Sequence, residues 1–351
     1  MSKRNSARFA TMCVRGAPAQ TQRDNPARIE LLRAVVHQIE RRARLDPRWR
    51  GLDALILPGG YFRLAQNAGC ASLRSRTELL DATGLVAPLC EAARRLAVSS
   101  QAYIVGGADG PDSDKTRATG SQGGGDQLCV AWAPERVAGI GRKIFPVWEA
   151  YPKTGNYEGD HYVCCADDYE SDERIITLAR GGSAVLCACY DMFGVADCAG
   201  ESDARARKIQ HISTSTRIHH RERPASVEQS GHAFGPLLDN CIKRWRGLLR
   251  RRSVNVALAA IHQFEGASTS FWQRHGIAGA SAALNGGWAV GAAHFRALPS
   301  GAEKSTLAAH AVPARHAGQG QSRRAHTLTP VDSFSTEATG AAIPALVRLF
   351  G

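Results

Sequence analysis

A lysine and a cysteine in two separate apolar segments are the residues of this chain best suited to chemistry. Lys143 stands in the segment Arg142-Lys143-Ile144-Phe145-Pro146, and Cys189 follows the apolar run 184–188. A cysteine at the end of a buried strand becomes a reactive thiolate when a cation lies near it. The pair therefore indicates an activated thiol nucleophile with a lysine as its electrostatic partner.

Cys187 is the rival nucleophile, because it stands only two residues before Cys189. Side chains alternate along a strand, so positions 187 and 189 are expected on the same face, and spacing does not separate them. Only Cys189 is followed directly by an aromatic and an acidic residue, Tyr190 and Asp191. We therefore assign the nucleophile to Cys189 and interpret Cys187 as a small buried hydrophobe of the core.

The elements expected around these residues make a mixed α/β chain. Apolar runs of strand length and apolar residues at helical spacing alternate along most of the sequence. Strands are predicted at 8–16, 53–57, 102–107, 127–132, 184–189, 254–261, 288–293, 306–309 and 325–328. Helices are predicted from Asn25-Pro26 onward, at 77–97, 237–250 and 271–284, and at the end over 342–350.

One domain over residues 1–351 is the organisation we expect. The segment 199–236 is polar and irregular, which is typical of an inserted surface segment, and no internal repeat or linker divides the chain. A chain of 351 residues with 44% hydrophobic content can bury a substantial core. The core is expected within about 8–330.

Composition excludes several other classes. The ten cysteines form no CxxC pair, so neither a disulfide scaffold nor a zinc site is expected. The chain has no apolar run of about 18 residues, and its basic start lacks the apolar region of a signal peptide, so we expect a cytoplasmic protein without a membrane partner. The net charge of +12 comes without any zinc-finger or helix-turn-helix signature, so we expect no nucleic-acid partner.

The order of the motifs resembles that of the carbon–nitrogen hydrolase superfamily, which includes nitrilases, aliphatic amidases and carbamoylases. The strand 53–58 is similar to the family strand that ends in Pro-Glu. Arg142-Lys143-Ile144 with Glu149 is similar to the lysine motif and its second glutamate, and 186–191 is similar to the nucleophile motif. The segment 254–295 resembles the strand, helix and strand that follow in the family.

The resemblance implies a four-layer α-β-β-α sandwich of the nitrilase type that assembles as a homodimer or higher homo-oligomer. It also implies a thiol-dependent hydrolase of a small-molecule amide or nitrile, which works through a covalent intermediate on Cys189 without a metal or another cofactor. Lys143 would stabilise negative charge, and Glu149, with Glu158 as a weaker alternative, would position substrate or water. The substrate-binding residues that we expect are Tyr190, Gly59, Tyr61 and Trp272.

Position 59 departs from the family pattern. Gly59 and Gly60 follow Pro58, where the family carries its general-base glutamate. Loss of a general base typically costs about 10²- to 10⁴-fold in rate. Either another carboxylate replaces it (Glu78, Asp109 or Glu149), or the protein is a weak or silent relative with a ligand-binding or scaffolding role. His275 and His294 suggest a Cys–His enzyme, but the sequence places neither of them beside Cys189.

Overall fold

The computed structural model describes residues 7–15, 24–66, 72–97, 101–110, 127–145, 163–180, 182–196, 217–220, 223–227, 231–263, 272–284, 287–295, 306–311, 325–336 and 345–351. A sheet of fourteen strands dominates this part of the chain, and its main path has the order β6-β5-β4-β2-β1-β13-β12-β9-β8. These strands are β1 (Phe9–Arg15), β2 (Ala54–Ile56), β4 (Tyr103–Asp109), β5 (Gln127–Trp132), β6 (Val137–Arg142), β8 (Ile175–Leu178), β9 (Gly182–Ala188), β12 (Val254–Gln263) and β13 (Trp288–Phe295).

The remaining strands extend this sheet or form a small second one. The long sheet also contains β3 (Phe62–Arg63), β14 (Thr306–Ala311), β15 (Ala325–Thr327), β16 (Asp332–Thr336) and β17 (Ala345–Phe350). The second sheet has three strands, β7 (Val163–Cys165), β10 (Arg217–His220) and β11 (Arg223–Val227). No helix in the described ranges is long and apolar enough to cross a membrane.

The long sheet turns back on itself, so that its two halves face each other. A Cβ added to Gly141 on β6 would lie 2.6 Å from the carbonyl oxygen of Leu186 on β9, which shows how closely the halves approach. Apolar side chains from both halves fill the space between them, among them Val105, Leu258 and Val290. The halves therefore form the two inner layers of a sandwich.

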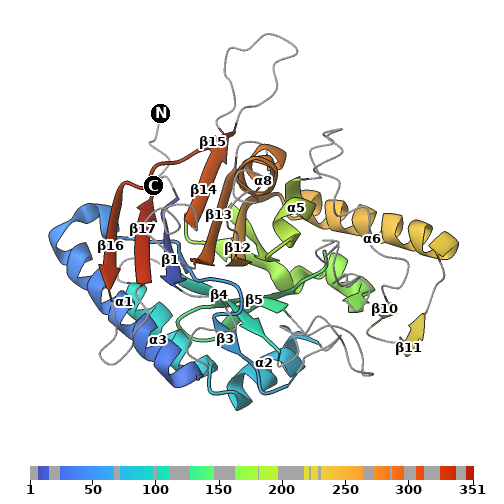
Figure 1. Ribbon diagram of the computed structural model, residues 1–351, viewed down its shortest axis with the longest axis horizontal. Helices are drawn as coiled ribbons and strands as arrows, with labels where there is room; N and C mark the ends of the chain where they lie inside the picture. The colour runs from blue at the N-terminus through green and yellow to red at the C-terminus, as the bar shows by residue number, and fades with distance from the viewer. Residues whose placement is uncertain are drawn as a thin grey trace, which may run out of the picture.

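Helices cover the two outer faces of this sandwich (Figure 1). On one face lie α1 (Asn25–Leu45), α2 (Leu73–Ala82) and α3 (Val86–Leu96), whose apolar residues share a core with β1, β2, β4 and β5. On the other lie α5 (Asp191–Ala196), α6 (Gly231–Arg251) and α8 (Gly279–Ala283), which share a core with β9, β12 and β13. The expected four-layer α-β-β-α arrangement is confirmed.

The helix α1 illustrates how local sequence sets an element. Asp24 accepts a hydrogen bond from the backbone N–H of Ala27 at 3.2 Å, and Pro26 stands in the first turn, where its missing N–H costs nothing. Leu32, Val35 and other apolar residues at helical spacing are buried. The prediction of a helix from Asn25 is confirmed.

The helix predicted over 77–97 is wrong as a single element. Two helices, α2 and α3, meet at Gly84, which has a φ of 75°. Glycine adopts this left-handed conformation without the steric cost of a Cβ, so the chain can turn there. The apolar residues on both sides of Gly84 belong to one core and therefore gave the appearance of one helical period.

Several further elements differ from the sequence-based expectation. The helix predicted over 342–350 is the strand β17, whose residues Ala345, Val347 and Leu349 alternate into the core, and which pairs antiparallel with β1. No strand is predicted where β3, β6, β7, β10, β11 and β16 lie. Two of these strands, β10 and β11, fall within the segment 199–236 that was expected to be irregular. The expected helix at 271–284 is a π-helical segment, η6 (Trp272–Ala278), followed by α8.

Candidate active site

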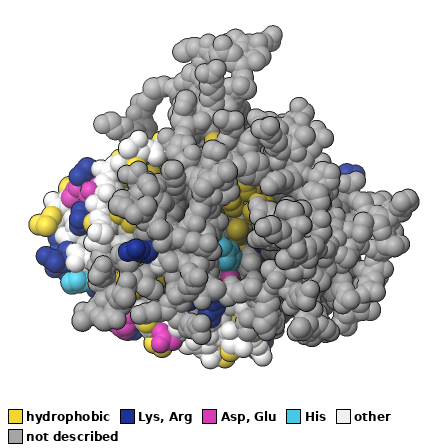
Figure 2. Space-filling model, viewed as in Figure 1, with side chains coloured by type: hydrophobic (Ala, Val, Ile, Leu, Met, Phe, Trp, Pro, Cys, Tyr) yellow, Lys and Arg dark blue, Asp and Glu magenta, His cyan; other side chains and the backbone are white. Residues whose placement is uncertain are grey.

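Several strands end at one edge of the sandwich. β2, β4, β9, β12 and β13 all run in the same direction. The hairpins β4–β5 and β5–β6 reverse the chain twice, so that β6 runs parallel to β4. Ligand sites commonly lie at the carboxyl ends of such strands. Figure 2 shows a histidine and an acidic side chain together in a hollow of one face, beside hydrophobic side chains.

Cys189 stands on a sharp turn between β9 and α5. Its φ is 50°, and within the described ranges only Ser253 shares a positive φ among residues other than glycine. A non-glycine residue in this region is strained, and such strain is found disproportionately at functional sites. The Cys189 N–H donates to the carbonyl oxygen of Ala260 at 2.9 Å, which fixes the turn against β12.

The same turn distinguishes the two candidate cysteines. β9 ends at Ala188, so the alternation of a strand does not extend to Cys189. Cys187 is fully buried within β9, and its sulfur lies 4.0 Å from the carbonyl oxygen of Val185. Cys189 keeps 6% of its surface exposed. The assignment of the nucleophile to Cys189 stays a prediction, and it is supported by the position of Cys189 on a slightly exposed turn rather than within the strand.

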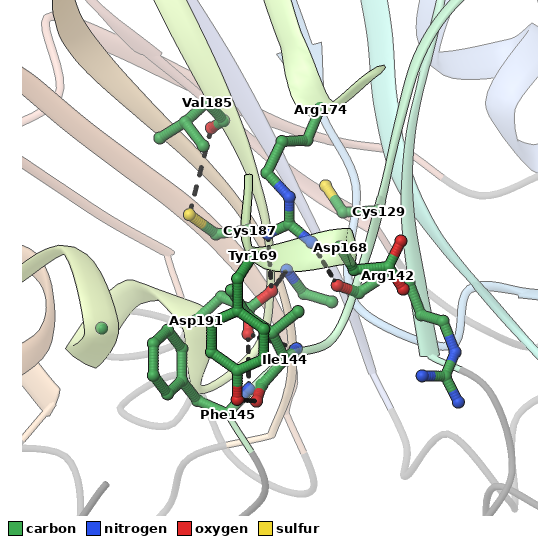
Figure 3. Close-up of polar contacts among 12 residues, drawn as sticks. Cys129, Arg142, Ile144, Phe145, Asp168, Tyr169, Arg174, Val185, Cys187 and Asp191 are labelled. Carbon is green, nitrogen blue, oxygen red and sulfur yellow. Dashed lines mark hydrogen bonds and ion pairs between the residues drawn. The ribbon is translucent and has the colours of Figure 1, made fainter. Parts of the chain in front are cut away.

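Asp191 joins the Lys143 segment to the Cys189 turn. Its Oδ1 accepts hydrogen bonds from the two backbone N–H groups that follow Lys143, at 2.9 and 3.1 Å, and its Oδ2 accepts one from Ala188 at 3.2 Å (Figure 3). One carboxylate therefore holds the neighbours of both residues. Lys143 itself is 1% exposed.

A buried arginine, Arg174, pairs with this carboxylate. Arg174 lies 3.5 Å from Asp191 and donates to the carbonyl oxygen of Arg142, directly before Lys143 (Figure 3). Burial raises the pKa of the Asp191 carboxyl, although Arg174 and the backbone N–H groups oppose that rise. The cluster extends to a second buried ion pair, which joins Arg76 to Asp168 at 3.0 Å.

Asp191→Asn is expected to lower the free energy of unfolding by about 3–5 kcal/mol, because the variant removes the carboxylate that pairs with the buried Arg174. The amide also cannot accept hydrogen bonds at both of its polar atoms. Denaturant unfolding at neutral pH measures the loss. Asp172→Asn is the matched control, since Asp172 pairs with Arg252 at the surface and should matter far less. Equal losses in the two variants would contradict a special role for Asp191.

A histidine that the sequence did not single out lies beside Cys189. His262 stands near the end of β12, and its Nε2 lies 2.7 Å from Oδ2 of Asp109, at the end of β4. Burial acts to lower the pKa of His262, but the Asp109 carboxylate and the neighbouring Cys189 side chain together raise it to about 10. The arrangement therefore favours a charged imidazolium beside the sulfur.

His294, one of the two histidines considered from the sequence, lies beneath the loop after β2. Its Nε2 lies 3.1 Å from the carbonyl oxygen of Gly59, so Nε2 carries the hydrogen and donates it. The ring is fully buried, and burial together with the charge of His262 holds the pKa of His294 well below its ordinary value. His294 is therefore a neutral support of the Gly59 loop.

The predicted substrate-binding residues occupy different surroundings. Tyr190 and Trp272 lie with their ring centroids 5.5 Å apart, and both also pack on Phe193, so they form an aromatic wall next to Cys189. Tyr61 is 2% exposed, and its hydroxyl donates to the carbonyl oxygen of Arg28 on α1 at 2.8 Å. Gly59 lies against His262. Their roles in binding stay predictions.

The carboxylates considered as replacements for a glutamate at position 59 lie in different parts of the molecule. Asp109 lies at the site with His262. Glu78 is exposed on α2 and pairs with Arg74, one turn away on the same helix. Glu149 and Glu158 lie outside the described residues, as does the side chain of His275.

A positional signal for His262 is present in the sequence. His262 directly follows the predicted strand 254–261, just as Cys189 stands at the end of the predicted strand 184–189. Only the strand order, in which β9 and β12 are neighbours, turns that coincidence into contact.

Comparisons with known proteins find similarity among solved structures only. No protein-family model and no curated protein sequence matches it. Among solved structures it is similar to a variant of a nitrilase-superfamily amidase from Nesterenkonia AN1, with 14% identity, a TM-score of 0.44, and 98% of this chain and 90% of that chain covered. It is also similar to a carbon–nitrogen hydrolase from Helicobacter pylori G27, with 12% identity, a TM-score of 0.40, and coverage of 86% and 82%. A third is a CN-hydrolase superfamily protein from Xanthomonas campestris, with 14% identity, a TM-score of 0.41, and coverage of 92% and 91%.

Proposed function

We propose that the protein hydrolyses a non-peptide C–N bond, in an amide or a nitrile, with Cys189 as the nucleophile. One observation carries the proposal. The strained turn that presents Cys189 and the backbone that carries Lys143 are bound by the same carboxylate, Asp191. Asp191 thereby links the backbone beside a cysteine to the backbone beside a lysine at the carboxyl ends of two strands, and these residue types fit nucleophilic catalysis.

In the proposed chemistry Cys189 is the nucleophile and Lys143 stabilises negative charge. The Cys189 sulfur attacks the carbon of the amide or nitrile and forms a covalent adduct, which water later hydrolyses. Lys143, as a cation in a site of low dielectric, stabilises the thiolate and the negative charge that develops on the substrate heteroatom. The low exposure of Cys189 favours a small-molecule substrate. A homo-oligomer and a cytoplasmic location remain predictions.

A silent relative with a ligand-binding or scaffolding role is the second candidate, and Gly59 favours it, because the residue has no group that could act as a base. The two candidates share the fold and differ in turnover. Ligand binding without chemistry would leave Cys189 unmodified by a substrate-like electrophile.

Ammonia release from a panel of short aliphatic amides and nitriles tests the proposal, together with labelling by a haloacetamide and peptide mapping by mass spectrometry. We expect turnover of at least one substrate class and a label on Cys189. Cys187→Ser should leave both results unchanged, because Cys187 is buried in β9. A panel without turnover and a label confined to other cysteines would favour the silent relative.

A further inference from the structure

We propose that His262, oriented by Asp109, is the acid–base residue for Cys189 and fills the place that a side chain at position 59 would occupy. The inference rests on the proposed function and names the group that moves the proton in it. It also explains why glycine stands at both positions after Pro58.

Gly59 makes room for the His262 ring. A Cβ added at position 59 would lie 2.7 Å from Nδ1 of His262, 2.8 Å from its backbone N, and 2.9 Å from the carbonyl oxygen of Ala260. Real Cβ atoms do not approach so closely. The backbone of Gly59 is fixed there, since its N–H donates to the carbonyl oxygen of Ile261 at 2.9 Å. A glutamate at position 59 and the present place of His262 therefore exclude each other.

Gly60 makes room for Asp109 in the same way. A Cβ at position 60 would lie 2.6 Å from Oδ2 of Asp109, the oxygen that binds His262. Gly60 also has a φ of 61°, which disfavours other residues. Each glycine of the pair thus accommodates one member of the His262–Asp109 pair, so the departure from the Pro-Glu pattern and the presence of this pair are one structural feature.

The ring nitrogens of His262 have separate partners. Nε2 binds Asp109, a carboxylate with 1% exposure, and this fixes the orientation of the ring. Nδ1 has no hydrogen-bond partner among the described residues and is the nitrogen that remains for Cys189. A carboxylate that holds one nitrogen while the other meets a nucleophile is the arrangement of a catalytic triad.

The charges around His262 favour its protonated form. Asp109 from β4 is the nearest opposite charge, and Cys189 adds a second when it is a thiolate. Arg63 on β3 lies 3.8 Å from Asp109 and offsets part of its charge. Among the described residues, Arg28 and His294 also lie near this pair, and His294 is a neutral ring. The ring therefore keeps a proton on Nδ1 at neutral pH, where it can be donated.

Two steps then complete the hydrolysis of an amide. The Cys189 sulfur bonds to the carbonyl carbon and the π pair moves to oxygen. That pair then re-forms the C=O bond as the C–N bond breaks with its electron pair on nitrogen, which takes the proton of Nδ1, so that an amine and a thioester result. Water then transfers a proton to Nδ1 while its oxygen bonds to the acyl carbon of the thioester. The C–S bond breaks with its electron pair on sulfur, which releases the acid and restores the thiolate and the imidazolium.

His262→Gln is the first test, with His37→Gln as the matched control on the exposed side of α1. We expect kcat/KM for an amide that the protein turns over to fall by about 10²- to 10⁴-fold in the first variant and to stay unchanged in the second. Asp109→Asn, which keeps the shape of the side chain, should cause a smaller loss in the same direction.

The pH dependence of alkylation by iodoacetamide separates a catalytic histidine from a structural one. In the wild-type protein the Cys189 rate should stay nearly constant from pH 6 to 9, because His262 keeps its proton throughout that range. In His262→Gln the rate should rise with pH, as for an ordinary thiol with a pKa near about 8.5. This measurement needs no substrate, so it remains decisive if the amide is unknown.

The outcomes distinguish the inference from the proposed function. An unchanged alkylation profile in both His262→Gln and Asp109→Asn overturns the inference, even if Cys189 proves to be the nucleophile. Turnover that survives Cys189→Ala overturns the proposed function instead. If His262→Gln does not fold, as judged by circular dichroism, Asp109→Asn alone carries the test.

Discussion

Replacing Cys189 with alanine is expected to abolish turnover and covalent labelling together. Loss of a covalent nucleophile removes the whole pathway through the thioester, and comparable losses in other enzymes are on the order of 10⁶-fold. Ammonia release and peptide mapping measure the two effects. Cys187→Ala is the matched control, because it removes a thiol that is buried in the core only two residues before Cys189. Labelling that persists in Cys189→Ala would contradict the assignment.

Cys189→Gly should be as inactive as Cys189→Ala and more stable. Relief of the left-handed conformation contributes about 1–2 kcal/mol, whereas the added freedom of glycine in the unfolded chain costs about 0.4–1 kcal/mol. The net effect is a gain of about 1 kcal/mol, measurable by denaturant unfolding. Such a gain would show that the side chain at position 189 strains the turn, so that the cysteine costs stability in order to place its sulfur there. No gain over alanine would mean that the turn is not strained by its side chain.

The parts of the fold that could be predicted are those with a local signal. Strands such as β4 and β5 consist of short apolar runs, and α1 combines a capping aspartate, a proline and a helical period. The elements that were wrong depend on distant partners. β17 is a strand because it pairs with β1, more than 300 residues earlier in the sequence. The run 345–350 is too short for its apolar spacing to decide between a helix and a strand.

The candidate site divides in the same way. The sequence singles out Cys189, which follows the apolar run 184–188, and Lys143, which precedes Ile144-Phe145-Pro146. Their catalytic roles stay predictions. His262 and Asp109 carry no motif, and their contact depends on strand order and on the way the halves of the sheet face each other. Asp109 was considered as a substitute for the missing glutamate, but on its own rather than as the partner of a histidine. Tertiary structure alone could supply that pairing.

Lys143→Met is expected to lower kcat/KM by about 10⁴-fold. Removal of one neutral oxyanion-hole donor typically costs about 10²- to 10³-fold, and a charged donor contributes roughly twice the free energy. Methionine keeps most of the length and apolar volume of the side chain, so the change mainly removes charge from a residue that is 1% exposed. Lys143→Arg should recover only part of the activity, because the planar guanidinium does not fit the place of an ammonium group.

Lys243→Met is the matched control, since Lys243 lies exposed on α6 and its loss removes the same charge from the protein. Steady-state kinetics and the denaturation midpoint should be measured on both variants. A structural role for Lys143 predicts that activity falls only as far as the folded fraction falls. An electrostatic role predicts a loss of kcat in fully folded protein, together with slower alkylation of Cys189, because the cation that favours the thiolate is gone. Rates that match those of Lys243→Met would remove Lys143 from the mechanism and leave His262 as the group that activates the sulfur.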